Sequence, residues 1–312
     1  MGELPDYRVR PATRAFLHCG VDYAGPIQIR ATPGRGHKSR KAYIAVFVCM
    51  TVKAIHIELV SDCSTPAFVS AFDRFCARRG IPSNMYSDNA MNFQGAQREL
   101  AIAWRAATCD PNVLNKLTAQ EVKWNFILPS APHFGGLWEA SMRSVKYHLK
   151  RVIDAHTLTF EEMSTFLCRV KACLNSRPIA PISDNYDDYS ALTPGHFLIG
   201  PAITSFPEPL LLNEKKTRLT RWKVLSQMRD SFWKTWSHDY VHTLQQRPKW
   251  RDIHDLTRVG RLVLMRNPLA FPCNWELGRI IECHPGDDGL RGLGRVEILK
   301  KSIFGFLHIP IL

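Results

Sequence analysis

The stretch FLHCGVDYAGPIQI, residues 16–29, predicts the first strand of the fold. Its aliphatic and aromatic residues are typical of a strand, and the pair Gly25-Pro26 predicts the point at which that strand ends. One residue is unusual there, because Asp22 lies in the middle of the run. A strand of this kind normally buries one or both of its faces, so a charged side chain at that position calls for an explanation.

Two β-rich runs follow, at residues 41–50 and 54–60, and predict a meander with the first strand. Helices and strands then alternate: a helix after residue 64, a strand in IPSNMYSD, a helix in NFQGAQRELAIAWRAA, a strand over 122–129, a helix that opens with Glu139, and a helix over 158–178. Three strands followed by this alternation predict an α/β fold with a mixed sheet covered by helices.

The first of these helices carries clear end signals. Ser64 or Thr65 can cap it, Pro66 suits its first turn, and Gly80 ends it. Apolar residues recur at the spacing of one helix face and predict a side packed on the core: Phe68, Phe72, Phe75 and Cys76.

The pattern changes after residue 180. A Pro-rich irregular stretch leads into a helical stretch with several tryptophans, and short strands joined by turns then predict a small β-barrel. A chain of 312 residues is long enough for two or three domains. The expected division is a tail at 1–13, the α/β core at 14–180, the connection with its helical linker at 181–250, and the barrel at 251–312.

Charge and cysteine content narrow the class of protein. Lysine plus arginine number 41 against 28 aspartates and glutamates, and a net charge of +13 predicts a polyanionic partner, most often nucleic acid. The nine cysteines are irregularly spaced with no CxxC pair, which indicates reduced thiols and an intracellular protein rather than a disulfide framework. No apolar run is long enough to predict a membrane span.

Three acidic residues lie at the edges of predicted elements. Asp22 is in the first strand, Asp88 follows the carboxyl end of a short strand, and Glu139 opens a helix. Ligand sites of open α/β sheets lie at such strand ends, so the three carboxylates can converge over one sheet edge. Clustered carboxylates need a cation to stay ionised, and oxygen ligands favour Mg²⁺ or Mn²⁺. Two such ions would activate an attacking oxygen and stabilise a leaving oxygen at a phosphodiester.

Each of these acids also has a structural interpretation. Asp22 can be a turn former, Asp88 with Asn89 can form an Asx turn, and Glu139 can stabilise the positive end of its helix. His238 and His242 lie one helical turn apart, but they are interpreted as surface residues because two further metal ligands are lacking.

The helix that opens with Glu139 raises the same choice. Arg143, Lys146 and Lys150 follow on the same face. They can be a solvated stripe with an ordinary ion pair, worth about 0.3–0.5 kcal/mol. They can also be a phosphate-binding surface beside a catalytic carboxylate.

Several motifs strongly resemble the integrase core of BEL/Pao-type LTR retrotransposons: GVDYAGP at 20–26, YSDNAMNF at 86–93, PHFGGLWEA at 132–140, LNSRPI at 174–179 and LTPGHFLIG at 192–200. The tail from about residue 213, with WELGRIIECHPG at 275–286, resembles the segment that follows this core in the same polyproteins. The resemblance therefore covers almost the whole chain.

The resemblance implies an RNase H-like core with a mixed five-stranded sheet and flanking helices, followed by a helical linker and a small SH3-like barrel. It implies a DDE polynucleotidyl transferase in which Asp22, Asp88 and Glu139 hold two Mg²⁺ or Mn²⁺ ions. The expected partners are double-stranded DNA, as element ends and target, and further copies of the chain, with the nucleus as the place of action. The DNA-binding residues expected are His133, Gly135, Gly136, Arg143, Lys146 and Lys150, the glycines because a residue without Cβ lets DNA approach the backbone.

Two other functions stay open. A catalytically inactive derivative of such an integrase, either a genomic remnant or a domesticated protein, would bind DNA through the same basic surface. A basic scaffold whose Trp-rich tail binds protein would not act on nucleic acid at all. The three acids favour the enzyme, whereas no Cys-His spacing in the sequence rebuilds the family's N-terminal zinc module, which favours an inactive or incomplete protein.

Overall fold

The computed structural model describes residues 13–31, 38–88, 90–107, 122–126, 136–154, 156–183, 185–206, 208–212, 214, 220–244, 259–265, 267, 270–285, 291–298 and 301–303; the side chains of 103–107, 136–141, 283–285, 291–298 and 301–303 lie outside this description. The chain forms two compact units, residues 1–174 and 175–312. The finer boundaries expected near residues 13, 180 and 250 stay predictions.

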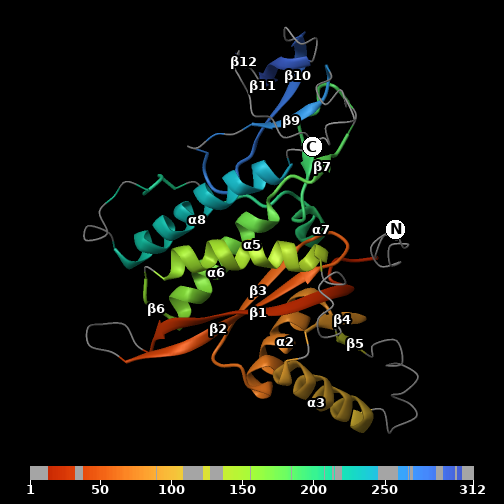
Figure 1. Ribbon diagram of the computed structural model, residues 1–312, viewed down its shortest axis with the longest axis vertical. Helices are drawn as coiled ribbons and strands as arrows, with labels where there is room; N and C mark the ends of the chain where they lie inside the picture. The colour runs from red at the N-terminus through yellow and green to blue at the C-terminus, as the bar shows by residue number, and fades with distance from the viewer. Residues whose placement is uncertain are drawn as a thin grey trace. The chain divides into compact units, whose positions relative to one another are not determined.

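The first unit is built on a six-stranded mixed sheet whose main path has the order β3-β2-β1-β4-β5 (Figure 1). Three strands form an antiparallel meander: β1 (His18–Arg30), β2 (Ser39–Cys49) and β3 (Ile55–Val60). Three more pair in parallel: β4 (Asn84–Ser87) with β1, β5 (Lys123–Phe126) with β4, and the short β6 (Leu158–Thr159) with the end of β1. This arrangement confirms the predicted mixed α/β sheet and is consistent with an RNase H-like core; β6 was not predicted.

Helices cover both faces of this sheet. α2 (Thr65–Arg79) and α3 (Met91–Ala107) lie on one face, and α5 (Gly136–Ile153) and α6 (Phe160–Asn175) lie on the other (Figure 1). The N-cap of α2 is Ser64, whose hydroxyl accepts from the Ala67 N–H, and the helix ends at Gly80, as predicted.

The apolar face of α2 enters the core in the predicted way. Phe68, Phe72 and Phe75 are buried, and the Phe75 ring stacks on Phe47 of β2 with centroids 4.3 Å apart. Cys76, at the edge of the same face, is only partly buried.

The strand β1 does not end at Gly25-Pro26, so that part of the sequence prediction is wrong. Pairing with β2 shifts register between Ala24 and Ile27 and then continues to Arg30. Gly25 has a φ of +131°, a backbone angle that residues with a side chain rarely adopt. Proline has no N–H to donate to a hydrogen bond between the strands. The Gly-Pro pair therefore marks a bulge inside a longer strand.

The helix expected over 158–178 begins two residues later than predicted. The Thr159 hydroxyl accepts from the Glu162 N–H at 3.3 Å, and the Glu162 carboxylate accepts from the Thr159 N–H at 2.9 Å. This reciprocal pair is a capping box. It fixes the start of α6 at Phe160 and leaves Leu158 and Thr159 free to pair with β1 as β6.

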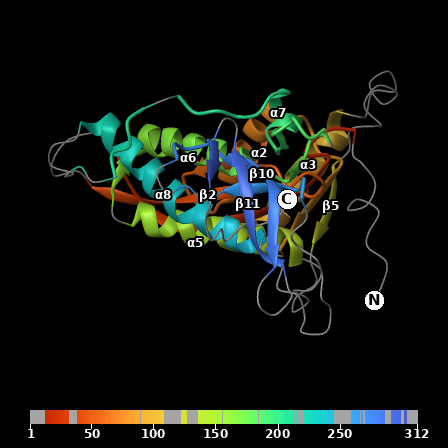
Figure 2. The ribbon, with the colours of Figure 1, turned by 90° about the horizontal axis from the view of Figure 1, so that it is seen from above.

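The second unit combines a long helix with a four-stranded antiparallel sheet of order β12-β11-β10-β9. Its elements are β7 (Ala180–Pro181), β8 (Ala191–Leu192), α7 (His196–Ile199), α8 (Arg221–Leu244), β9 (Leu262–Met265), β10 (Glu276–Pro285), β11 (Arg291–Ile298) and β12 (Lys301–Ile303). β10 and β11 lie side by side in Figure 2. Among the described strands no pairing joins β12 to β9, so the predicted barrel is not shown.

Tryptophans of α8 pack inside this second unit. The Trp233 ring meets Trp275 edge to face at 4.7 Å, and its Nε1 donates to the Ala270 carbonyl at 3.1 Å. Trp236 also contacts Trp275, at 6.0 Å between centroids, and both Trp233 and Trp236 are buried. Trp222, at the start of the helix, is exposed instead.

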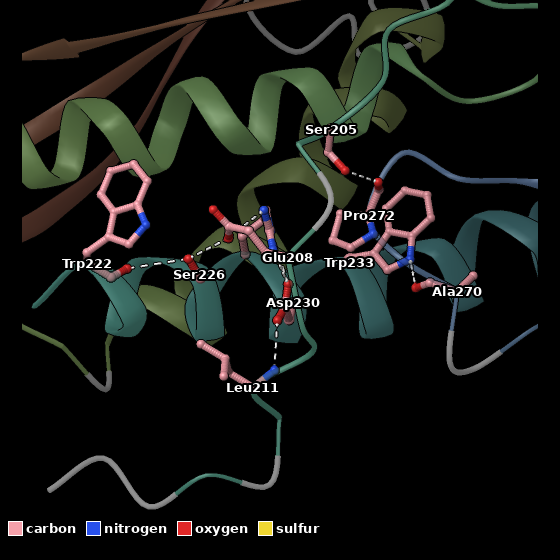
Figure 3. A network of polar contacts seen from close by, with 10 residues as sticks. Ser205, Glu208, Leu211, Trp222, Ser226, Asp230, Trp233, Ala270 and Pro272 are labelled. Atoms are coloured by element: carbon pink, nitrogen blue, oxygen red, sulfur yellow. Dashed lines mark hydrogen bonds and ion pairs between the residues drawn. The ribbon is translucent and has the colours of Figure 1, made fainter. Parts of the chain in front are cut away.

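A polar network joins α8 to the segment before it (Figure 3). Glu208 accepts from the Ser226 hydroxyl at 2.9 Å and pairs with the guanidinium of Arg229 at 3.3 Å. Arg229 also donates to Asp230, whose second oxygen accepts from the Leu211 N–H at 3.2 Å. Arg229 and Asp230 are both buried. Their contacts therefore hold the segment around residues 208–211 against α8.

None of the helices in the described part of the chain is both long enough and apolar enough to span a bilayer.

Candidate active site

Asp22 lies within the ladder of β1, and both oxygens of its carboxylate have partners. It stands opposite Val46 of β2, so its interpretation as a turn residue is wrong. Oδ1 accepts from the Tyr23 N–H at 2.6 Å, and Oδ2 forms an ion pair with the Nζ of Lys146 on α5. The two side chains are 29% and 31% exposed, so the pair is within reach of solvent.

The neighbour of Asp22 shows which face of the sheet the carboxylate occupies. The Tyr23 ring stacks on Phe93 of α3 at 5.4 Å and meets Phe68 of α2 edge to face at 6.1 Å. Burial in this aromatic layer raises the pKa of Tyr23 above its usual range. Because successive strand residues point to opposite faces, Asp22 points toward α5, where Lys146 meets it.

Asp88 directly follows β4, the strand beside β1. The two strands run parallel, with Gly20 opposite Tyr86. Asp88 is the first residue after β4, and Asp22 lies two residues beyond Gly20 on β1, so both acids lie near the same ends of these two neighbouring strands. The strand order thus brings together two of the three predicted carboxylate positions.

Asp88 also forms the Asx turn that was its structural interpretation. Its Oδ1 accepts from the Ala90 N–H at 3.2 Å, and the Ala90 carbonyl accepts from Phe93 and Gln94 at the start of α3. The turn uses one carboxylate oxygen, and the side chain stays exposed. A structural role and a ligand role are therefore compatible at this residue.

Two residues that the sequence analysis missed hold the Asp88 turn in place. The indole Nε1 of Trp124 in β5 donates to the Ser87 hydroxyl at 3.0 Å, and that hydroxyl donates to the Asp88 carbonyl at 2.9 Å. Ser87 is fully buried. A serine directly before the acid was the available sequence signal, but its partner lies on another strand.

Glu139 belongs to the first turn of α5. It precedes Lys146 by seven residues, which is about 10 Å along the helix axis and nearly the same face. On that face of α5, Lys146 forms its ion pair with Asp22. The Glu139 side chain lies outside the described residues, and within them no group of three or more His, Cys, Asp or Glu side chains is gathered as metal ligands. The three-carboxylate metal site therefore stays a prediction.

The predicted DNA-binding residues fall into two groups. His133 and Gly135 lie outside the described residues, as does the environment of Gly136 at the start of α5. Arg143 and Lys150 are exposed on α5.

The basic stripe of α5 is not uniform. Lys146 turns toward Asp22, while Arg143 and Lys150 face outward. Two residues that the sequence analysis missed share the outward face: Tyr147 is 53% exposed, and Arg151 donates to its hydroxyl at 2.8 Å with the guanidinium 5.2 Å from the ring centroid. The opposite face of α5 is buried and consists of Met142, Val145, His148, Leu149 and Ile153.

A second group of charged residues lies on the edge strand β3. The carboxylate of Glu58 accepts from Arg74 at 3.0 Å, from Arg78, and from His56 at 2.8 Å. The Arg79 Nε donates to the other ring nitrogen of His56 at 3.3 Å. Glu58 and His56 are buried, whereas the Arg74 and Arg78 side chains are 39% and 54% exposed, so this closed network covers a buried acid with arginines from the surface.

Similarity to known proteins is found for the second unit and, at low identity, for the whole chain. The model of a family of unknown function, DUF5641, matches residues 220–304, which begin one residue before α8 and end one residue after β12. The chain is similar to a solved structure of a simian T-cell lymphotropic virus intasome in complex with PP2A regulatory subunit B56 gamma, with 10% identity, a TM-score of 0.38, and coverage of 100% of this chain and 84% of that chain. No curated protein matches the chain.

Proposed function

We propose that this chain is an integrase of the DDE type, similar to those of BEL/Pao-type LTR retrotransposons, and that it transfers DNA strands with the help of divalent metal ions. The observation that carries the proposal is the position of Asp22 on β1, facing α5, and of Asp88 directly after the parallel neighbour β4, with Glu139 in the first turn of α5. The sequence motifs around these three residues supply the resemblance.

The carboxylates present fit a divalent cation. Asp22 on β1 and Asp88 just after the neighbouring strand β4 would repel each other at close range unless a cation lay between them. A cation, the Lys146 ammonium, already lies against Asp22. With Glu139 as third ligand, Asp22 and Asp88 would hold two Mg²⁺ or Mn²⁺ ions, which when bound activate the attacking oxygen and stabilise the leaving oxygen.

The residues of the chain position the carboxylates and the DNA and form no covalent bond with the substrate. The Tyr23 N–H fixes one oxygen of Asp22, and Ser87 fixes the backbone at Asp88. Arg143 and Lys150 on the outward face of α5 bind the DNA backbone and align a phosphodiester with the carboxylates. The reacting oxygen is the 3′-hydroxyl of a DNA end, or water when the end is processed.

We also propose how the second unit folds and how the chain assembles on DNA. The four-stranded sheet of the second unit would belong to a small SH3-like barrel. The chain would act as a homo-oligomer on element ends and target DNA, in the nucleus. Exposed cations on α5 and the net charge of +13 support a DNA partner.

A catalytically inactive DNA-binding derivative is the second candidate. The ion pair of Lys146 with Asp22 favours it, because a lysine can neutralise an acid without any metal. A scaffold that binds protein through its tryptophans has less support, since Trp233 and Trp236 are buried inside their own unit.

Strand transfer on short duplexes with Mg²⁺ and with Mn²⁺ tests the proposal. We expect transfer by the wild-type chain and none by Asp22→Asn or Asp88→Asn. DNA binding without transfer in either metal would favour the inactive derivative. If binding is also absent at about 50 mM salt, where phosphate contacts are strong, neither reading holds.

A further inference from the structure

The ion pair between Lys146 and Asp22 joins α5 to the central strand β1. The ammonium meets the Oδ2 of a carboxylate whose Oδ1 is already held by a backbone N–H. The pair is about one third exposed on each side, so neither partner is sealed in the core. Arg143 and Lys150, one turn to either side, face outward.

The helix itself is firmly packed, whereas the Lys146 side chain is partly exposed. Met142, Val145 and Leu149 are each 1% exposed and anchor α5 beside the sheet. Lysine carries its charge on a flexible four-carbon stem, so the ammonium can swing without any shift of the helix. Its reach includes both Asp22 and the outward face that carries Lys150.

An ammonium on the Oδ2 of Asp22 opposes the binding of a divalent ion to the same carboxylate. The two cations repel each other at that distance. Asp22 is therefore a better metal ligand when Lys146 has left it. A DNA phosphate at the outward face of α5 offers the ammonium another anionic partner.

We propose that Lys146 is shared between Asp22 and the DNA backbone, and that this exchange couples DNA binding to metal binding. Without DNA the ammonium pairs with Asp22 and opposes the metal. With DNA it pairs with a phosphate, and Asp22 becomes available. This inference rests on the proposed function, because that function assigns both the metal and the DNA to this site. Coupling is reciprocal, so metal raises the affinity for DNA by the same factor.

Binding of Mn²⁺ tests the exchange without any catalytic step. The signal of free Mn²⁺ in electron paramagnetic resonance gives its affinity for the wild type, Lys146→Gln and Lys150→Gln, with and without a short duplex; the Mn²⁺ held by the duplex alone is subtracted. Without DNA we expect Lys146→Gln to bind Mn²⁺ about tenfold more tightly than the wild type, within the usual range of coupling. With DNA the wild type should gain a similar factor and Lys146→Gln should gain none.

Two variants control for unspecific effects. Lys150→Gln removes the same charge from the same helix but not from Asp22, so its Mn²⁺ affinity without DNA should equal that of the wild type. Lys146→Arg keeps a cation at Asp22 and should also resemble the wild type. Thermal melting of each variant shows whether it is folded.

The outcomes separate this inference from the proposed function. If the wild type and Lys146→Gln bind Mn²⁺ equally well in the absence of DNA, the exchange is wrong and the proposed function stands. If Asp22→Asn binds Mn²⁺ as tightly as the wild type, the metal does not use Asp22, and both are wrong. Both also fail if neither the wild type nor Lys146→Gln binds Mn²⁺.

Discussion

Glu58 and Asp22 are carboxylates of the same sheet, and the protein surrounds them differently. Glu58, on the edge strand β3, is buried and accepts from two arginines and a histidine. Asp22, on the central strand β1, has one lysine and one backbone N–H, and the next strand sets Asp88 beside it. Both acids look alike in the sequence, as charges within β-rich runs.

The difference shows how a structural acid can be told from a candidate ligand. Burial would raise the pKa of Glu58, but hydrogen bonds from His56 and Arg74 outweigh it and hold the pKa at about 2. Glu58 thus has two arginine partners within the fold of its own unit. Among the described residues, the ion pair found for Asp22 and Asp88 is the one with Lys146, and a cation from solution can add to it.

The largest expected effect is on catalysis at the open site. Asp22→Asn, Asp88→Asn and Glu139→Gln should each lower strand transfer by about a thousandfold or more, and a double variant should lose little beyond that, because the groups act as one unit. Quantified transfer products give the comparison. Near-normal transfer by any one variant removes that residue from the site.

The same variants should leave the fold nearly intact. Asp22→Asn loses one partly exposed ion pair, worth about 0–1 kcal/mol. Relief of repulsion between Asp22 and Asp88 acts in the opposite direction. Thermal melting without metal should therefore differ little from the wild type; unfolding of Asp22→Asn would show that Asp22 is structural like Glu58.

The next largest effect is the loss of stability of the closed network in acid. Burial lowers the pKa of His56 from 6.5 to about 4, and the pKa of Glu58 lies at about 2 instead of 4.5. Both values are lower in the folded chain, so the unfolded chain binds more protons and stability falls as pH falls. His56 should carry the loss between pH 6.5 and about 4, and Glu58 from 4.5 to about 2.

Urea unfolding at a series of pH values measures this loss. The part due to His56 should be of the order of 3 kcal/mol between neutral pH and about pH 4. In His56→Gln, the free energy of unfolding should change less between pH 6.5 and about 4. The loss below pH 4.5 that is due to Glu58 should remain. A wild-type stability that does not change down to pH 4 would contradict the network.

A smaller effect is expected on DNA binding at the outward face of α5. Arg143→Glu or Lys150→Glu should weaken binding to all duplex sequences and flatten the salt dependence by about one unit for each lost phosphate contact. Arg98→Glu is the matched control, since it reverses an exposed arginine on α3, over the other face of the sheet. Fluorescence anisotropy at several salt concentrations measures the affinity for DNA and its salt dependence. If all three variants lose the same affinity, α5 is not the DNA-binding surface.

The smallest effect concerns the support of Asp88. Ser87→Ala removes the hydroxyl between the Trp124 indole and the Asp88 carbonyl, which should cost about 1 kcal/mol of stability. Strand transfer should fall severalfold, much less than in Asp88→Asn, because the carboxylate itself remains. A loss of stability with unchanged transfer would show that Ser87 does not position Asp88.

Much of the first unit could be predicted because its signals are local. The strand runs, the Ser64 cap and the Phe68 face of α2 depend on residues close in sequence, and the structure confirms them. The same local signal misled at Gly25-Pro26, because only pairing with β2 distinguishes a bulge from a strand end.

The site could be predicted only in part. Helical spacing gives Arg143, Lys146 and Lys150 a common face, but packing decides which of them meets the sheet, and it selects Lys146. Likewise the partner of Ser87 is Trp124, far away in sequence. Glu139 remains a prediction from the motif.

Anomalous diffraction from crystals grown with Mn²⁺ tests the central claim most directly, because it locates the ion itself. We expect a peak between the carboxylates of Asp22 and Asp88, within metal-ligand distance of Glu139, with the Lys146 ammonium withdrawn from Asp22. Peaks only elsewhere at saturating Mn²⁺, or no peak with the ion pair of Lys146 and Asp22 intact, would contradict it.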